Sequence, residues 1–136
     1  FGIPLAQVEL RPYSPDYLEQ YTDIDIALDT FPYTGGVTTC EALYMGVPVV
    51  TLKGGTHGAR FGASLLENAG LAELVAKSER EYAEIAKLLA SSPETLQMLR
   101  EKQRDMLLAS PLMNFRQYVQ EVEAAYEKVW RRWEEA

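Results

Sequence analysis

The sequence predicts an α/β fold: half of a doubly wound domain with parallel strands, continued by a helical C-terminal extension. Two observations carry this prediction. Strand-like apolar runs alternate with glycine loops and helical segments in the first half of the chain, whereas only helical patterns follow in the second half. We therefore divide the chain into an α/β portion over residues 1–76 and a helical portion over residues 77–136.

The N-terminal residues contain a short apolar stretch and a helix start. Val8-Glu9-Leu10 is a short stretch with two apolar residues, and we expect an exposed edge of the sheet near residues 6–10, through which a dimer of the chain could form. Ser14-Pro15-Asp16 combines an N-cap residue, a proline at the first helical position and an acid in the first turn. Tyr17, Leu18 and Tyr21 would form the apolar stripe of that helix.

The middle of the chain predicts two strand–loop–helix units. Residues 47–52 form a continuous apolar run, typical of a parallel strand that is covered on both faces. Gly46 and Gly70 each mark the end of a helix. The expected order is a strand over 24–29, a loop over 31–36, a helix over 38–45, a strand over 47–52, a loop over 53–56 and a helix over 59–69.

Three helices are expected after residue 77. Ser78-x-x-Glu81 is a capping box, Ser92-Pro93-Glu94 opens a second helix, and Ser110-Pro111 breaks the chain before a third. This last helix repeats apolar residues with a period of 3.6, which predicts a packed face. That face consists of Phe115, Tyr118, Val119, Val122, Tyr126, Val129, Trp130 and Trp133.

The composition limits the partners of the chain. Apolar residues make up 47% and charged residues 24%, as in an ordinary folded domain. Thirteen Lys and Arg face twenty Asp and Glu, and the net charge of −7 argues against nucleic acid or an anionic membrane as a partner. The single Cys40 excludes an internal disulfide and a multi-cysteine metal site.

The sequence carries no targeting signal that we recognise. No apolar run approaches the ~18 residues of a membrane span, and no signal peptide precedes the fold. We therefore expect a cytoplasmic location. Because the chain opens at Phe1 without a methionine, we also expect a piece of a longer protein.

The strongest chemical signal is the glycine loop before the helix at residues 38–45. Gly35 and Gly36 let the backbone approach a ligand, and the free N–H groups near Val37 suit a phosphate. Thr38 and Thr39 add hydroxyl donors, and Glu41 could accept hydrogen bonds from a sugar diol. Thr38-x-x-Glu41 also fits a capping box, in which both side chains only satisfy the helix end. The spacing leaves both interpretations open.

A second glycine-rich loop follows the strand at residues 47–52. It contains His57, the only histidine, and Arg60, and it would lie at the carboxyl end of a parallel strand, where ligands bind. His57 could equally be a cap or a surface group, and Arg60 could pair with one of the many acids.

Other candidates are weaker. Asp23, Asp25 and Asp29 are read as turn and strand-edge acids rather than metal ligands. The helix start around Cys40 could lower the pKa of its thiol, but no partner for a catalytic thiol is in view, and we expect Cys40 to be a core residue.

Taken together, these runs resemble the donor-binding half of the O-GlcNAc transferase and SPINDLY family of protein glycosyltransferases. The resemblance extends over nearly the whole chain from about residue 24 and is nearest to SPINDLY and its bacterial relatives. It is carried by residues 25–33, Gly35, and residues 38–51, 57–60, 64–66, 70–71, 73–76, 110–112 and 126–133.

The resemblance implies a two-domain enzyme of GT-B fold, usually preceded by tetratricopeptide repeats. Such an enzyme moves a sugar from a nucleotide diphosphate sugar to Ser or Thr hydroxyls of proteins. This chain would be the C-terminal part of the second, Rossmann-like domain. The donor, UDP-GlcNAc or GDP-fucose, would be bound without a metal or cofactor by Gly35, Gly36, Val37, Thr38, Thr39, Glu41, His57 and Arg60.

This chain departs from the family pattern at two positions, and an essential residue of the family is not in it. Relatives often carry Thr or His where this chain has Gly36, and Thr where it has Val37, so backbone N–H groups would hold more of the diphosphate. The essential lysine of the family, and the domain that receives the acceptor protein, would lie upstream of Phe1. No catalytic residue is therefore assigned, and the chain alone is expected to be inactive.

Two alternative functions stay open at this point. A nucleotide-sugar 2-epimerase shares the same fold and a similar donor site. A non-catalytic interaction domain of a repeat-containing protein would explain the loss of side-chain donors at Gly36 and Val37.

Overall fold

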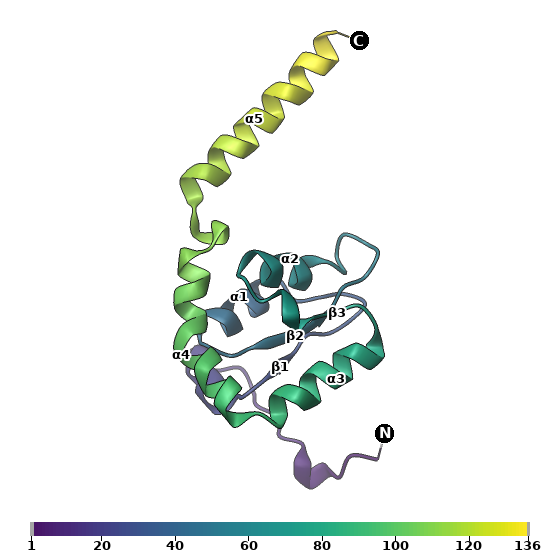
Figure 1. The fold of residues 1–136 in the computed structure, drawn as a ribbon, viewed down its shortest axis with the longest axis vertical. Helices are drawn as coiled ribbons and strands as arrows, with labels where there is room; N and C mark the ends of the chain where they lie inside the picture. Colours follow the sequence, from purple (N-terminus) through teal and green to yellow (C-terminus); the bar gives the residue numbers. More distant parts are fainter. Residues whose placement is uncertain (1, 136) are drawn as a thin grey trace.

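The computed structural model describes residues 2–135 and is built around a small parallel sheet (Figure 1). The strands are β1 (Ala27–Leu28), β2 (Val49–Leu52) and β3 (Val75–Ala76), in the order β1-β2-β3. Ala27 pairs with Val49, and Thr51 pairs with Val75. All pairs are parallel, as the strand–helix alternation predicts.

Helices cover both faces of this sheet. Figure 1 shows α1 (Val37–Tyr44) and α2 (Phe61–Asn68) on one face and α3 (Glu79–Ala90) on the other. The long α4 (Pro93–Ala109) contacts both α1 and α3 and closes one end of the sheet. The arrangement confirms the doubly wound α/β class.

The core forms around β2. Residues 47–51 are almost completely buried, because helices cover this strand from both sides. Gly46 ends α1 with a φ of 78°, and a Cβ at this position would lie 2.8 Å from the carbonyl oxygen of Arg100 in α4. The largest buried apolar side chains are Leu43, Leu66, Leu71, Val47, Val49 and Val50.

Two capping predictions agree with the structure. Ser78 accepts a hydrogen bond from the N–H of Glu81 at 3.2 Å, and the Glu81 carboxylate accepts one from the N–H of Lys77 at 2.7 Å. Pro93 stands at the start of α4, as Ser92-Pro93-Glu94 predicts.

The N-terminal segment differs from the prediction. Residues 8–10 belong to no strand, and β1 forms the edge of the sheet instead. The prediction of a sheet edge near residues 6–10 is therefore wrong. The structure gives no support for a dimer formed through that edge. The helix expected after Ser14 is the 3₁₀ segment η2 (Tyr17–Asp23), and the other 3₁₀ turns are η1 (Leu5–Gln7), η3 (Ala72–Leu74) and η4 (Pro111–Met113).

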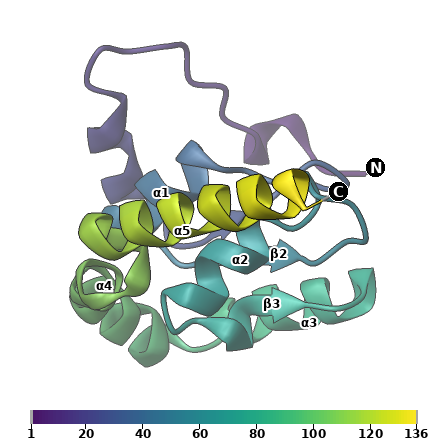
Figure 2. The ribbon, with the colours of Figure 1, turned by 90° about the horizontal axis from the view of Figure 1, so that it is seen from above.

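The last helix, α5 (Phe115–Glu134), also differs from the prediction. It extends away from the α/β body (Figure 1), and Figure 2 views it from above. No α5 residue is buried, and Trp130 and Trp133 are 58% and 69% exposed. The centroids of their rings lie 5.1 Å apart. The apolar stripe exists, but the prediction that it packs within this chain is wrong.

Candidate functional site

The two glycine loops predicted from the sequence meet at the carboxyl end of the sheet. One loop connects β1 to α1 and the other connects β2 to α2. Thr34, which is 1% exposed, joins them: its N–H and its hydroxyl both donate to the carbonyl oxygen of Gly58, at 3.2 and 3.0 Å. The N–H of Gly62, at the start of α2, donates to Thr34 Oγ1 at 3.2 Å. This contact fixes the loops against each other.

Asp29 connects the first loop to the sheet. Its carboxylate accepts hydrogen bonds from the N–H of Gly35 and from the hydroxyl of Thr51, both at 2.7 Å. Its carbonyl oxygen accepts the hydroxyl of Tyr82 at 2.8 Å. A Cβ on Gly62 would overlap Asp29 Oδ2 and Thr51 Oγ1. The glycine at this position therefore allows α2 to lie close to these hydrogen bonds.

The first turn of α1 is free of side-chain caps. The N-cap is Gly36, and within residues 2–135 the N–H groups of Val37, Thr38 and Thr39 donate to no protein acceptor. A Cβ on Gly35 would lie 2.7 Å from the hydroxyls of both Thr38 and Thr39, so these hydroxyls flank the glycine. Such a helix end presents oriented N–H donors and the positive end of the helix dipole to an anion.

The capping-box interpretation of Thr38-x-x-Glu41 is wrong. Thr38 is not the N-cap but lies inside α1, and its side chain caps no N–H group. The Glu41 carboxylate instead accepts the hydroxyl of Tyr17 at 2.5 Å. Glu41 is therefore available for a role other than capping.

Burial and the Glu41 carboxylate together raise the pKa values of three groups near α1. The hydrogen bond to Glu41 raises the pKa of the Tyr17 hydroxyl. Burial, followed by the charge of Glu41, raises the pKa of Tyr21 and of the half-buried Cys40. The pKa of the Cys40 thiol thus moves opposite to the lowering that a helix start could cause. Cys40 is half-buried and is not part of the hydrophobic core cluster, so the expectation that it is a core residue is not confirmed.

His57 and Arg60 lie in a separate hollow of about 460 Å³ beside α2. The His57 ring meets Phe61 edge to face at 4.8 Å. Lys53 also lines the hollow and pairs with Glu67 at 2.7 Å. The predicted residues thus fall into two groups, at the α1 end and at the α2 loop, which are linked by the backbone contact between Thr34 and Gly58.

Sequence reasoning missed two functional candidates. Tyr17 was expected to be part of an apolar stripe, and Asp29 to be a strand-edge acid. Tyr17 bonds to Glu41, 24 positions away, and Asp29 bonds to Thr51, 22 positions away. No local sequence pattern encodes such side-chain pairs.

The described residues contain neither a cluster suited to a metal ion nor a helix suited to span a membrane. Residues 2–135 hold no group of three or more His, Cys, Asp or Glu side chains arranged for a metal ion. In the same part of the chain, no helix combines the length and the apolar character that crossing a bilayer requires.

Comparison with known proteins decides the family. The family model described as Glycosyl transferase family 41 matches residues 18–122, a span that contains both loops and helices α1 to α4. The chain belongs to glycosyltransferase family 41. This membership confirms the resemblance to the O-GlcNAc transferase and SPINDLY proteins.

The relatives extend well beyond the present chain. It is 44% identical over 135 residues to a probable UDP-N-acetylglucosamine–peptide N-acetylglucosaminyltransferase SPINDLY of Petunia hybrida, covering 97% of this chain and 14% of the relative. It is 33% identical over 110 residues to the UDP-N-acetylglucosamine–peptide N-acetylglucosaminyltransferase of Caenorhabditis elegans, and the match covers 81% of this chain and 10% of the relative. The chain therefore spans only a small part of the curated relatives.

A solved structure supports the fold. The K341M mutant of Thermobaculum terrenum O-GlcNAc transferase superposes with a TM-score of 0.80 at 45% identity, over 88% of this chain and 23% of that chain. Together with the parallel sheet, this likeness confirms the Rossmann-like, GT-B type of fold.

Proposed function

We propose that this chain forms the donor-binding part of a longer glycosyltransferase. The complete protein would move a sugar, GlcNAc or fucose, from a nucleotide diphosphate sugar to Ser or Thr hydroxyls of proteins. One observation carries the proposal: an uncapped α1 start, fixed by Asp29 and Thr34, at the carboxyl end of a parallel sheet. In a family 41 chain, this is where an open α/β sheet binds its ligand.

The diphosphate of the donor would lie against the start of α1. Gly35 and Gly36 leave room for it, and the free N–H groups of Val37, Thr38 and Thr39 would donate to its oxygens. Negative charge develops on the diphosphate as the sugar leaves, and donors already in place stabilise that charge. Backbone donors would serve here without the side-chain donors that relatives carry at Gly36 and Val37.

The nucleoside would lie along the outer side of α1. Glu41 stands one turn into the helix, and its carboxylate is suited to accept the hydroxyls of a ribose. His57 and Arg60 would face the sugar or a neighbouring domain from the second loop. We infer that no metal takes part, since the helix start and the upstream lysine implied by the family would offset the charge.

The chain alone would bind the nucleotide sugar but would not transfer the sugar. It covers 23% of the Thermobaculum terrenum transferase chain, so most of the catalytic machinery and the acceptor groove would lie in other segments. Sugar transfer by the purified 136-residue chain would overturn this part of the proposal.

A non-catalytic interaction domain is the second candidate. It is favoured by the absence of side-chain donors at Gly36 and Val37. Family membership favours a transferase over the 2-epimerase of the same fold.

Isothermal titration of the full-length protein with UDP and with GDP separates these candidates. A donor site binds one of the two nucleotides, and the preferred one identifies the base of the donor. Thr38→Val should weaken binding of that diphosphate but not of the bare nucleoside, because Thr38 would contact only the phosphates. A full-length protein that binds neither nucleotide would leave the interaction domain as the better account.

A further inference from the structure

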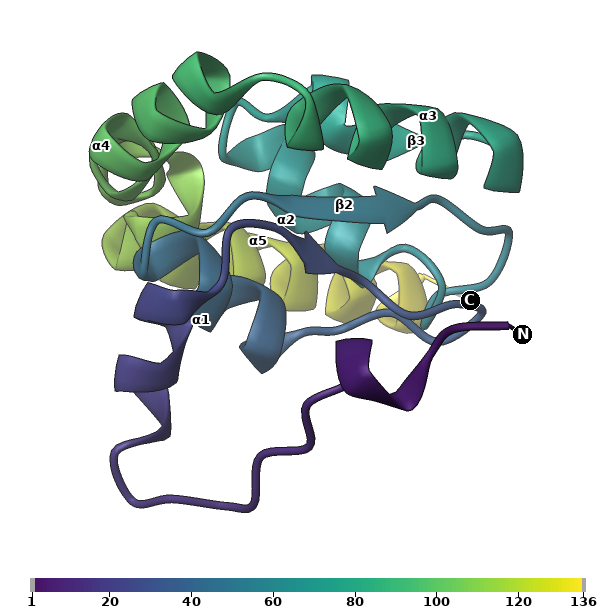
Figure 3. The ribbon, with the colours of Figure 1, turned by 90° about the horizontal axis from the view of Figure 1, so that it is seen from below.

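The Tyr17–Glu41 hydrogen bond connects two segments that are distant in the sequence. Tyr17 begins η2, which lies beside α1 in Figure 3, and its hydroxyl donates to Glu41 Oε1 at 2.5 Å. Within residues 2–135, Glu41 Oε2 accepts no hydrogen bond from the protein. One carboxylate oxygen is thus held and the other is left for a ligand.

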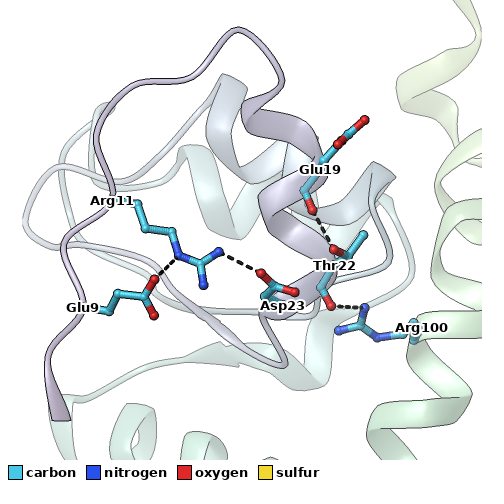
Figure 4. Close-up of polar contacts among 6 residues, drawn as sticks. All are labelled: Glu9, Arg11, Glu19, Thr22, Asp23 and Arg100. Carbon is cyan, nitrogen blue, oxygen red and sulfur yellow. Dashed lines mark hydrogen bonds and ion pairs between the residues drawn. The ribbon is translucent and has the colours of Figure 1, made fainter. Parts of the chain in front are cut away.

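The backbone that carries Tyr17 is fixed at its far end by other contacts. Arg100 of α4 donates to the carbonyl oxygens of Ile24, at 2.5 Å, and Thr22, at 3.4 Å. Arg11 bridges Glu9 and Asp23 at 2.7 and 3.0 Å (Figure 4). Loss of the Tyr17 hydroxyl would therefore leave η2 attached to the body.

A held carboxylate binds a diol better than a free one. A glutamate side chain loses rotamer freedom when it is fixed by a ligand, and this loss opposes binding. A hydrogen bond that already selects one orientation removes part of the cost before the ligand arrives. A carboxylate has about four acceptor positions, so one bond from Tyr17 leaves enough for two ribose hydroxyls.

We propose that Tyr17 is a positioning residue of the donor site: its hydroxyl orients the Glu41 carboxylate toward the ribose diol of the nucleotide. The inference rests on the proposed function and adds to it a residue from outside the α1 loop. The raised pKa of Tyr17 agrees with a hydroxyl that stays protonated as a donor at neutral pH.

The test compares nucleotides with and without the diol. Tyr17→Phe is titrated with UDP, GDP and the 2′,3′-dideoxy form of each. Tyr13→Phe is the matched control, because its hydroxyl is exposed and makes no hydrogen bond in the described part of the chain. We expect Tyr17→Phe to bind the preferred ribonucleotide about three- to tenfold more weakly. Its affinity for the dideoxy form and its Tm should stay at wild-type values.

Each other outcome contradicts a specific step. Unchanged or tighter ribonucleotide binding by Tyr17→Phe would overturn the positioning role. Equal weakening for the ribo and dideoxy forms would make Tyr17 a structural or base-contacting residue. A full-length wild-type protein that binds neither UDP nor GDP would overturn the proposed function itself, and this inference with it.

Discussion

The Asp29 carboxylate, directly after β1, accepts the N–H of Gly35 at 2.7 Å and so fixes the turn that leads into α1. The same carboxylate accepts the hydroxyl of Thr51 in β2. One nearly buried acid therefore ties the sheet to the loop that would hold the diphosphate, and its contribution to stability and to binding can be measured separately.

Asp29→Ala should lower the free energy of unfolding by about 2–4 kcal/mol, because the substitution removes two charge-assisted hydrogen bonds and leaves Gly35 N–H and Thr51 Oγ1 unpaired. Urea denaturation followed by circular dichroism measures this change. Asp29→Asn keeps an acceptor for Gly35 and should lose less. A loss below about 0.5 kcal/mol in Asp29→Ala would show that the anchor is unimportant.

Gly62→Ala should destabilise the chain by about 1–3 kcal/mol, because the new methyl group would overlap Asp29 Oδ2 and Thr51 Oγ1. Gly55→Ala is the matched control, since a Cβ there meets nothing within 4 Å. Thermal melting of both variants compares them. Equal melting temperatures would contradict the close approach of α2 to Asp29.

Glu41→Gln should leave the Tm near the wild-type value but weaken nucleotide binding about tenfold or more, because it removes the negative charge that would accept the ribose hydroxyls. The glutamine oxygen can still accept the Tyr17 hydroxyl, so the link between η2 and α1 is kept. Calorimetric titration with UDP and GDP measures the effect. Wild-type affinity in this variant would remove Glu41 from the donor site.

Trp130→Ala should change the stability of this chain by less than about 0.5 kcal/mol, because Trp130 is 58% exposed and α5 buries no residue. Leu99→Ala, at a position 5% exposed, should cost about 2–5 kcal/mol and serves as the comparison. Differential scanning calorimetry of both variants checks the contrast. A large loss in Trp130→Ala would mean that α5 packs on the body in solution.

The order of the elements from β1 to α2 and of the three C-terminal helices was predictable from the sequence, because apolar periodicity and helix-ending glycines are local signals. Strand β3, which has only two residues, was not predicted. The apolar run at residues 47–52 and the glycines that end α1 and α2 place β2 and its neighbouring helices within a few residues. The two site loops follow from the same pattern, since each comes directly after a strand of the sheet.

The contacts that shape the site were not predictable in this way. Asp29 and Tyr17 act through side chains on partners elsewhere in the sequence, and the spacing Thr38-x-x-Glu41 fits a cap that the structure does not form. The stripe on α5 shows a similar limit. An apolar period predicts that a helix has a face to bury, but it carries no information on which surface covers that face.

The most direct test of the account observes the amides of α1 during nucleotide binding. Titration of the ¹⁵N-labelled chain with UDP or GDP should shift the backbone resonances of Val37, Thr38 and Thr39 most, because their N–H groups would donate to the diphosphate. Resonances of α5, such as that of Val129, should stay in place. Saturating nucleotide that leaves these three α1 amides unshifted, or shifts only residues elsewhere, would contradict the donor site.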